Sequence, residues 1–225
     1  DVGIAIGLKK GNTLRDQINT VLAEITDEQR SELMEQIVTL ASGGTVTEFA
    51  VHCDAPATTT GTLKIGMECA YEPYNWTDTE GTSLGAVPIS SEGQSGLYAN
   101  GYDVMIAKKI AEANGWELEI VSSAWDSLCP AIQAGSMDAN IAGQSMTAER
   151  MAEVDMAGPY YYATIVVLTT KDSQYANATS IADLAGGTCT SQSGTIWYDS
   201  CLPQIENANL LAPADSAPAM IMQLQ

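Results

Sequence analysis

Positive charge and histidine are scarce in this chain of 225 residues. Nine Lys and Arg residues stand against 28 Asp and Glu residues, the formal net charge is −19, and His52 is the single histidine. Nucleic acids and anionic membrane surfaces are bound by basic surfaces, so the composition argues against both as partners. A lone histidine in a Thr-rich stretch has no orienting frame, which also argues against a Ser-His-Asp or Cys-His catalytic centre.

Long apolar runs are missing as well. No run of about 18 apolar residues occurs, so we expect no segment that inserts into a membrane. The apolar opening at residues 1–7 is short and has no basic flank before it, so we expect no signal peptide in this sequence. With 45% hydrophobic residues, the chain has enough apolar side chains for one large or two small domains.

The five cysteines lack the spacing of a metal site. No CxxC pair and no Cys/His cluster occurs, so we expect neither a zinc ion nor another cofactor. We interpret the cysteines as the sign of an extracytoplasmic chain with disulfides. Cys189 with Cys201 is the first candidate pair, Cys69 with Cys129 is the second, and Cys53 is left over. The alternative is that all are free or buried thiols.

Strand-like and helix-like patterns alternate along the chain. Apolar runs predict strands at residues 1–8, 63–70, 116–123 and 137–143. Apolar residues at three- and four-residue steps predict helices that begin near residues 13, 26, 101 and 125. The second of these helices has Thr26 or Asp27 as its expected cap. This alternation is typical of an α/β fold with a mostly parallel sheet that helices cover on both faces.

Other stretches predict connections and a second lobe. Residues 43–61 are rich in Gly, Thr, Ala and Pro, which predicts a linker or a poorly ordered segment, and residues 78–100 predict a surface flap. Residues 160–170 predict a long strand that carries the chain into the second lobe. Shorter elements are expected there, with strands at 186–192 and 209–213 and helices at 180–184, after 193–195 and from 216.

Residues 135–162 carry the strongest functional signal. A short apolar run is followed by a turn of small residues at 142–145 and then by Arg150. Free backbone amides at a helix start and the guanidinium fork both hold anions, so the pattern predicts a carboxylate trap. The alternative is a surface arginine that pairs with Glu149 or Glu153.

A second turn, at Ser193, Gly194 and Thr195, has the same composition and also precedes a predicted helix. It is either a second anion-binding turn or only a helix cap.

Four segments together resemble the extracytoplasmic amino-acid-binding proteins of ABC importers. They are ECAYEPYNW at 68–76, GYDVMIAKKIAE at 101–112, MDANIAGQSMTAERMAEVDMAGPYY at 137–161 and QSGT at 192–195. The resemblance implies a two-lobed periplasmic-binding-protein fold of type II that closes on a free amino acid and catalyses no reaction. It further implies the membrane subunits of an ABC importer as partners, an extracytoplasmic location and a monomer.

The resemblance also implies roles for single residues. Arg150 and the Thr147 amide would hold the ligand carboxylate, with Gly143 and Ser145 near the carboxylate or amino group. The remaining candidates are Ser193, Gly194 and Thr195 from the second lobe, Tyr71, Tyr74 or Trp76 against the ligand side chain, and Glu68 and Trp125. For Glu68 the alternative is a solvated or structural role, as it is for Asp103, and for Trp125 it is the core.

The chain departs from the family pattern at both ends. The strand and two helices that normally close the first lobe stand at residues 1–42, so we expect a circular permutation joined through residues 42–44. The domains would be the former C-terminal part of lobe 1 at 1–42, a linker at 43–61, the main part of lobe 1 at 62–162, and an incomplete lobe 2 at 163–225. About 35 residues of lobe 2, judged by the usual size of such domains, would be missing, with the acidic anchor for the ligand ammonium.

Three alternatives to a transport protein stay open. A Gly-Gly seam favours an engineered permutation that couples closure to a fused reporter, although a natural permutant or a joined fragment would give the same pattern. The ligand-binding domain of a receptor is the second alternative. An enzyme on the same fold is the third, against which stands the lack of paired carboxylates or an activated nucleophile at the strand ends.

Overall fold

The computed structural model describes residues 1–224. Contacts between backbone positions divide the chain into two compact units. We call Val2–Ala163 the sheet unit, and Asp1 together with residues 164–224 the C-terminal unit.

The sheet unit is built around five strands in the order β7-β2-β8-β1-β9. Their bounds are Val2–Leu8 for β1, Gly61–Met67 for β2, Trp116–Ser122 for β7, Ala139–Asn140 for β8 and Asp155–Ala163 for β9. Strand β2 pairs in parallel with β7 and β8, whereas β1 is antiparallel to both β8 and β9. Four of the five strands therefore run the same way, which confirms the mostly parallel α/β prediction.

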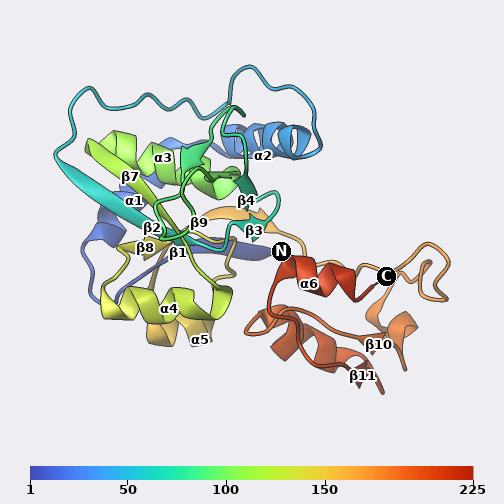
Figure 1. The fold of residues 1–225 in the computed structure, drawn as a ribbon. Helices are drawn as coiled ribbons and strands as arrows, with labels where there is room; N and C mark the ends of the chain where they lie inside the picture. The colour runs from blue at the N-terminus through green and yellow to red at the C-terminus, as the bar shows by residue number, and fades with distance from the viewer. Residues whose placement is uncertain (225) are drawn as a thin grey trace. The chain divides into compact units, whose positions relative to one another are not determined.

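Helices cover both faces of this sheet (Figure 1). Helices α1 (Leu14–Glu24), α2 (Asp27–Ala41) and α3 (Tyr102–Asn114) lie on one face, and α4 (Trp125–Ala134) and α5 (Ala148–Glu153) lie on the other. Helix α2 begins as predicted, because the Thr26 hydroxyl accepts from the Gln29 amide and the Gln29 side chain accepts from the Thr26 amide. Helix α3 ends at Gly115, whose positive φ of 67° suits glycine.

Strand β1 contributes to the cores on both sides of the sheet. Ile4, Ile6 and Leu8 belong to the main core, while Ala5 packs with Val154 and Met156 in a second cluster. Burial on both faces explains why the strand is a continuous apolar run without charged positions.

The predicted flap at 78–100 is folded rather than loose. Strands β3 (Ala70–Tyr71), β4 (Asn75–Asp78), β5 (Val87–Pro88) and β6 (Tyr98–Asn100) form an antiparallel sheet in the order β3-β4-β6-β5. Ile89 is only 5% exposed and bridges to Ile120 of β7. Backbone pairing and a buried apolar side chain thus attach this segment to the main sheet.

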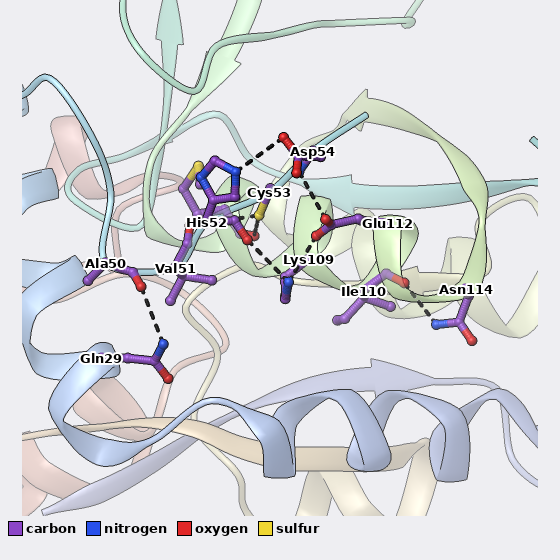
Figure 2. A network of polar contacts seen from close by, with 11 residues as sticks. Gln29, Ala50, Val51, His52, Cys53, Asp54, Lys109, Ile110, Glu112 and Asn114 are labelled. Atoms are coloured by element: carbon purple, nitrogen blue, oxygen red, sulfur yellow. Dashed lines mark hydrogen bonds and ion pairs between the residues drawn. The ribbon is translucent and has the colours of Figure 1, made fainter. Parts of the chain in front are cut away.

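Residues 43–60 contain no helix or strand, as predicted, and within them residues 49–54 are attached to the helices. Phe49 and Val51 are 7% and 2% exposed and belong to the main core. Figure 2 shows how the backbone around them is held by side chains of α2 and α3. Gln29 donates to the Ala50 carbonyl at 3.4 Å, Lys109 donates to the His52 carbonyl at 3.2 Å, and Glu112 accepts from the Asp54 amide at 3.0 Å. The composition of the segment did not indicate that two of its side chains lie in the core.

The C-terminal unit has short elements. Its parallel strands are β10 (Thr188–Cys189) and β11 (Asn209–Leu210), and its one longer helical segment is α6 (Ala217–Met222). Single helical turns occur at Ile181–Leu184, Trp197–Cys201 and Leu202–Gln204.

Several predicted strands are shorter than expected. The strand predicted at 160–170 ends at Ala163, where its pairing with β1 ends opposite Val2. Beyond that point Val166, Val167 and Leu168 are exposed. Strands β8 and β10 are likewise two residues long each, in place of the predicted 137–143 and 186–192. A strand requires a partner for its backbone groups, and an apolar pattern does not show where that partner ends.

The caps of α1 and α2 give a matched test of local stability. Thr26 makes a side-chain cap bond, whereas Thr13, at the equivalent position of α1, makes none. We expect Thr26→Ala to lower the free energy of unfolding by about 1 kcal/mol and Thr13→Ala to lower it by less than about 0.5 kcal/mol. Denaturant unfolding of both variants measures the difference. Equal losses would show that the Thr26 cap does not stabilise α2.

Candidate functional site

The loops that follow β2 and β8 lie next to each other, because these two strands are neighbours in the sheet. Gly143 packs directly on two rings of the aromatic loop. A Cβ atom on Gly143 would lie 2.8 Å from Cε1 of Tyr71 and 3.0 Å from Cγ of Tyr74, and its φ of +58° also suits glycine. The structure therefore brings together Gly143, Tyr71 and Tyr74, which the sequence assigned to one site.

Two backbone hydrogen bonds attach the turn at 142–146 to β1. The Ala5 amide donates to the Gln144 carbonyl at 3.0 Å, and the Met146 amide donates to the Gly3 carbonyl at 2.8 Å. Further along β1, the Gly7 amide donates to Oδ1 of Asn140 at 3.0 Å. No pattern in the sequence placed residues 3–7 beside this turn, although glycines at positions 3 and 7 are compatible with such a close backbone approach.

Arg150 is fixed at the far end of this turn. The Thr147 hydroxyl accepts from the Arg150 amide at 3.1 Å and caps α5. The Arg150 guanidinium donates to the Ser145 carbonyl at 2.8 Å and lies 5.1 Å from the ring centroid of Trp125. A carbonyl and an aromatic face thus both contribute to the position of the guanidinium. Four predicted site residues, Ser145, Thr147, Arg150 and Trp125, are thus in contact, with Trp125 also packed against the main core.

The three aromatic residues of the 68–76 loop have different environments. Tyr71 and Tyr74 are stacked with ring centroids 5.1 Å apart. Tyr74 is only 8% exposed and belongs to the core, whereas Tyr71 is half-buried, with burial raising its pKa to about 12. Trp76 is half-buried on β4 against the main core. Tyr71 is therefore the more exposed ring of a stacked pair whose other member belongs to the core.

Two predicted backbone donors are already used within the protein. The Gly143 amide donates to the Tyr160 hydroxyl at 3.2 Å, and the Ser193 amide donates to the Ala214 carbonyl at 2.8 Å. The Gly143 amide thus has the internal partner that a buried amide requires, while a place for Gly143 near the carboxylate or amino group of a ligand stays a prediction.

The turn at 193–195 lies in the C-terminal unit and caps the helical turn after it. The Thr195 hydroxyl donates to the Gln192 carbonyl at 2.7 Å and accepts from the Tyr198 amide at 3.3 Å. Gly194 has a positive φ of 63°. The capping alternative for this turn is thus observed, while a ligand role for it stays a prediction.

Two acidic candidates differ in burial. Glu68 is half-buried just beyond β2, and the Ser122 hydroxyl donates to its carbonyl at 3.4 Å. Asp103 is fully buried, so its structural alternative is confirmed. Burial raises the pKa of Asp103 to about 6, although hydrogen bonds from the side chains of Tyr160 and Asn75 act in the opposite direction.

The predicted disulfides are not formed, and all five cysteines are free thiols. Cys69 is buried and interacts with the Ser122 side chain, whereas Cys129 lies near Asn140 and Arg150. Cys189 lies on β10 and Cys201 ends the turn at Trp197–Cys201. Spacing along the chain did not reveal these different surroundings.

Residues 1–224 contain neither a membrane-spanning helix nor a metal-binding cluster. No helix among them has the length and apolar character to cross a bilayer. No group of three or more His, Cys, Asp or Glu side chains in this range is arranged to hold a metal ion.

The buried carboxylate predicts a specific pH dependence. Because the pKa of Asp103 is about 6 in the folded protein against an ordinary 3.8, the folded state binds the proton more tightly. The contribution of Asp103 to the free energy of unfolding therefore falls as pH rises from about 4 to about 6, by on the order of 1.4 kcal/mol per unit of pKa difference. Asp103→Asn removes this titration. Denaturant unfolding at several pH values should show that the free energy of unfolding of the wild type falls relative to that of the variant between about pH 4 and about pH 6. A difference that does not change with pH would contradict the burial argument.

Comparison with known protein families identifies the chain's relatives. The profile of bacterial extracellular solute-binding proteins, family 3, matches residues 63–223. The chain is 34% identical over 116 residues to the arginine-binding extracellular protein ArtP of Bacillus subtilis, covering 52% of this chain and 44% of that protein. It is 28% identical over 159 residues to a "probable histidine-binding protein" of Campylobacter jejuni, covering 71% and 54%. The chain thus spans about half the length of these relatives.

Solved structures give the same result. The arginine-bound, truncated ArgBP from T. maritima matches with a TM-score of 0.58 and 27% identity, over 73% of this chain and 68% of that chain. An ancestral amino acid-binding protein, AncCDT-1, a precursor of cyclohexadienyl dehydratase, matches with a TM-score of 0.59 and 25% identity, over 73% and 66%. These findings confirm the predicted resemblance, although they do not test the permutation. By its sequence profile and its fold, the chain belongs to family 3 of the bacterial extracellular solute-binding proteins.

Proposed function

We propose that this chain captures a free L-amino acid by its carboxylate at Arg150, for uptake through an ABC importer. The observation that carries the proposal is the guanidinium of Arg150, held by the Ser145 carbonyl and the Trp125 ring beside the end of β8. A guanidinium binds a carboxylate through two parallel hydrogen bonds, which suits a fixed arginine better than a mobile one. Membership of a solute-binding family supports this role.

Cationic amino acids are the first substrates to test. Tyr71, a predicted contact of the ligand side chain, is a half-buried aromatic ring, and aromatic rings attract cations. Glu68 follows the same strand, and the whole chain carries a net charge of −19. The names of two relatives, which refer to arginine and histidine binding, agree with this order of testing.

Capture would follow the two-lobed scheme. The ligand would favour a closed arrangement through contacts that only this arrangement offers, with residues 159–162 and 1–2 as the hinge. Turn 193–195 would supply the second lobe's contacts. An extracytoplasmic location and the membrane subunits of an importer as partners belong to the same proposal.

Residues 1–42 would complete the first lobe of this clamp. The pairing of β1 with β8 and β9, and its two backbone bonds to the turn at 142–146, support this assignment. In this proposal the segment order is permuted relative to the family.

A thermal-shift screen against the twenty amino acids tests the proposal. A ligand at one hundred times its dissociation constant stabilises the folded state by about 2.7 kcal/mol. We expect the largest shift with L-arginine or another cationic amino acid, and we expect Arg150→Ala to abolish it.

Arg15→Ala is the matched control, because Arg15 is an exposed arginine of α1 whose Nε lies 3.6 Å from Oδ1 of its neighbour Asp16. It should leave the ligand-induced shift unchanged. A wild-type shift in Arg150→Ala would show that the carboxylate is bound elsewhere. Absence of any shift in the wild type would count against amino-acid capture by this chain.

Binding without chemistry is the second part of the proposal, because one structural neighbour is a precursor of a dehydratase. We expect the amino acid that gives the largest shift to be recovered unchanged after prolonged incubation with the protein, as measured by mass spectrometry. Time-dependent formation of a product would assign the chain to the enzymes.

A further inference from the structure

A single buried carboxylate connects the two loops of the candidate site. Oδ1 of Asp103 accepts from the Tyr160 hydroxyl at 2.5 Å, and Oδ2 accepts from the Asn75 side-chain amide at 2.8 Å. Asp103, Tyr160 and Asn75 are all fully buried. A carboxylate that is shielded from water and bonded on both oxygens fixes the direction of both donors.

The first branch runs to the turn at 142–145. Because the Tyr160 hydroxyl gives its hydrogen to Asp103, its oxygen is left as an acceptor, and the Gly143 amide donates to it at 3.2 Å. Gly143 precedes Ser145 by two residues, and the Ser145 carbonyl holds Arg150. Asp103 thus fixes the turn through Tyr160.

The second branch runs to the aromatic loop. Because Asn75 donates its NH₂ group to Asp103, its Oδ1 is directed away and accepts from the Cys69 amide at 2.7 Å. Cys69 has a positive φ of 57°, which is costly for a residue with a Cβ atom, so the loop needs such a support. Cys69 is two residues before Tyr71.

The same loop is tied to the start of α3. The Tyr102 amide donates to the Pro73 carbonyl at 3.1 Å, and the Asp103 amide donates to the Tyr74 carbonyl at 2.8 Å. Backbone and side chain of Asp103 therefore both contact the segment that carries Tyr71.

We propose that Asp103 is the positioning residue of the binding site, and that it sets the Arg150 turn through Tyr160 and the Tyr71 loop through Asn75. The inference rests on the proposed function for the identity of the site, but the coupling of the two loops is a property of the ligand-free protein. Three variants separate the branches. Tyr160→Phe should disturb the turn around Gly143, Asn75→Ser should disturb the backbone at Cys69, and Asp103→Asn should disturb both.

The first measurement is the two-dimensional NMR spectrum of backbone amides in the ligand-free variants. We expect the Gly143 signal to shift in Tyr160→Phe, the Cys69 signal in Asn75→Ser, and both signals in Asp103→Asn. The second measurement is calorimetric titration with L-arginine. We expect Asp103→Asn to weaken its affinity on the order of 10-fold or more, as when the partners that orient metal ligands are removed.

Two controls separate positioning from a general loss of stability. Tyr102→Phe removes a buried hydroxyl from the same helix, one that donates to the Tyr160 carbonyl at 3.5 Å and not to Asp103. Thr26→Ala lowers stability at a distant helix cap. Both variants should leave the chemical shifts of the Gly143 and Cys69 amides and the affinity for L-arginine unchanged.

The outcomes are distinct. Asp103→Asn signals that match those of Tyr102→Phe would overturn the proposal. If Asp103→Asn does not fold, Tyr160→Phe and Asn75→Ser test the proposal instead. The proposal is also overturned if Tyr160→Phe does not shift the Gly143 signal selectively and Asn75→Ser does not shift the Cys69 signal selectively. Branch-specific shifts in a protein that binds none of the twenty amino acids would leave the positioning role intact and remove the proposed function.

Discussion

The central constraint in this protein is the position of β1 between β8 and β9. Its antiparallel pairing joins two strands that belong to the functional stretch at 135–162. Its backbone also bonds to the turn that leads to Arg150, through the Ala5 amide and the Gly3 carbonyl. Without this strand the turn would lose two backbone hydrogen bonds and β9 would lose its partner in the sheet.

The site above this strand depends on polar groups that are bonded inside the protein. Gly143 gives its amide to Tyr160, and Arg150 gives one donor to Ser145. A buried polar group without a partner costs about 1–3 kcal/mol, and these internal hydrogen bonds avoid that cost. The result is a loop whose backbone is already ordered before a ligand arrives, so binding would require less loss of conformational entropy.

The structural features that depend on neighbouring residues in the sequence were predicted best. The cap at Thr26 and the alternation of strands and helices follow from residues close together in the chain. The position of β1 and the end of β9 depend on partners more than a hundred residues away, so periodicity could not reveal them. Within the site, the residue types at Arg150 and Tyr71 led to the prediction of a ligand contact, but the bond from the Gly143 amide to Tyr160 and the network at Asp103 join residues that are far apart in the chain and carry no local signal.

The central claim is that a carboxylate is bound at Arg150. Calorimetric titration with L-arginine and with agmatine tests it most directly, because agmatine has the same side-chain cation and amine but lacks the carboxylate. The account predicts that the protein binds L-arginine and that its affinity for agmatine is at least about 100-fold weaker, as expected for the loss of a charged hydrogen-bonded pair. Equal affinity for the two compounds would contradict it.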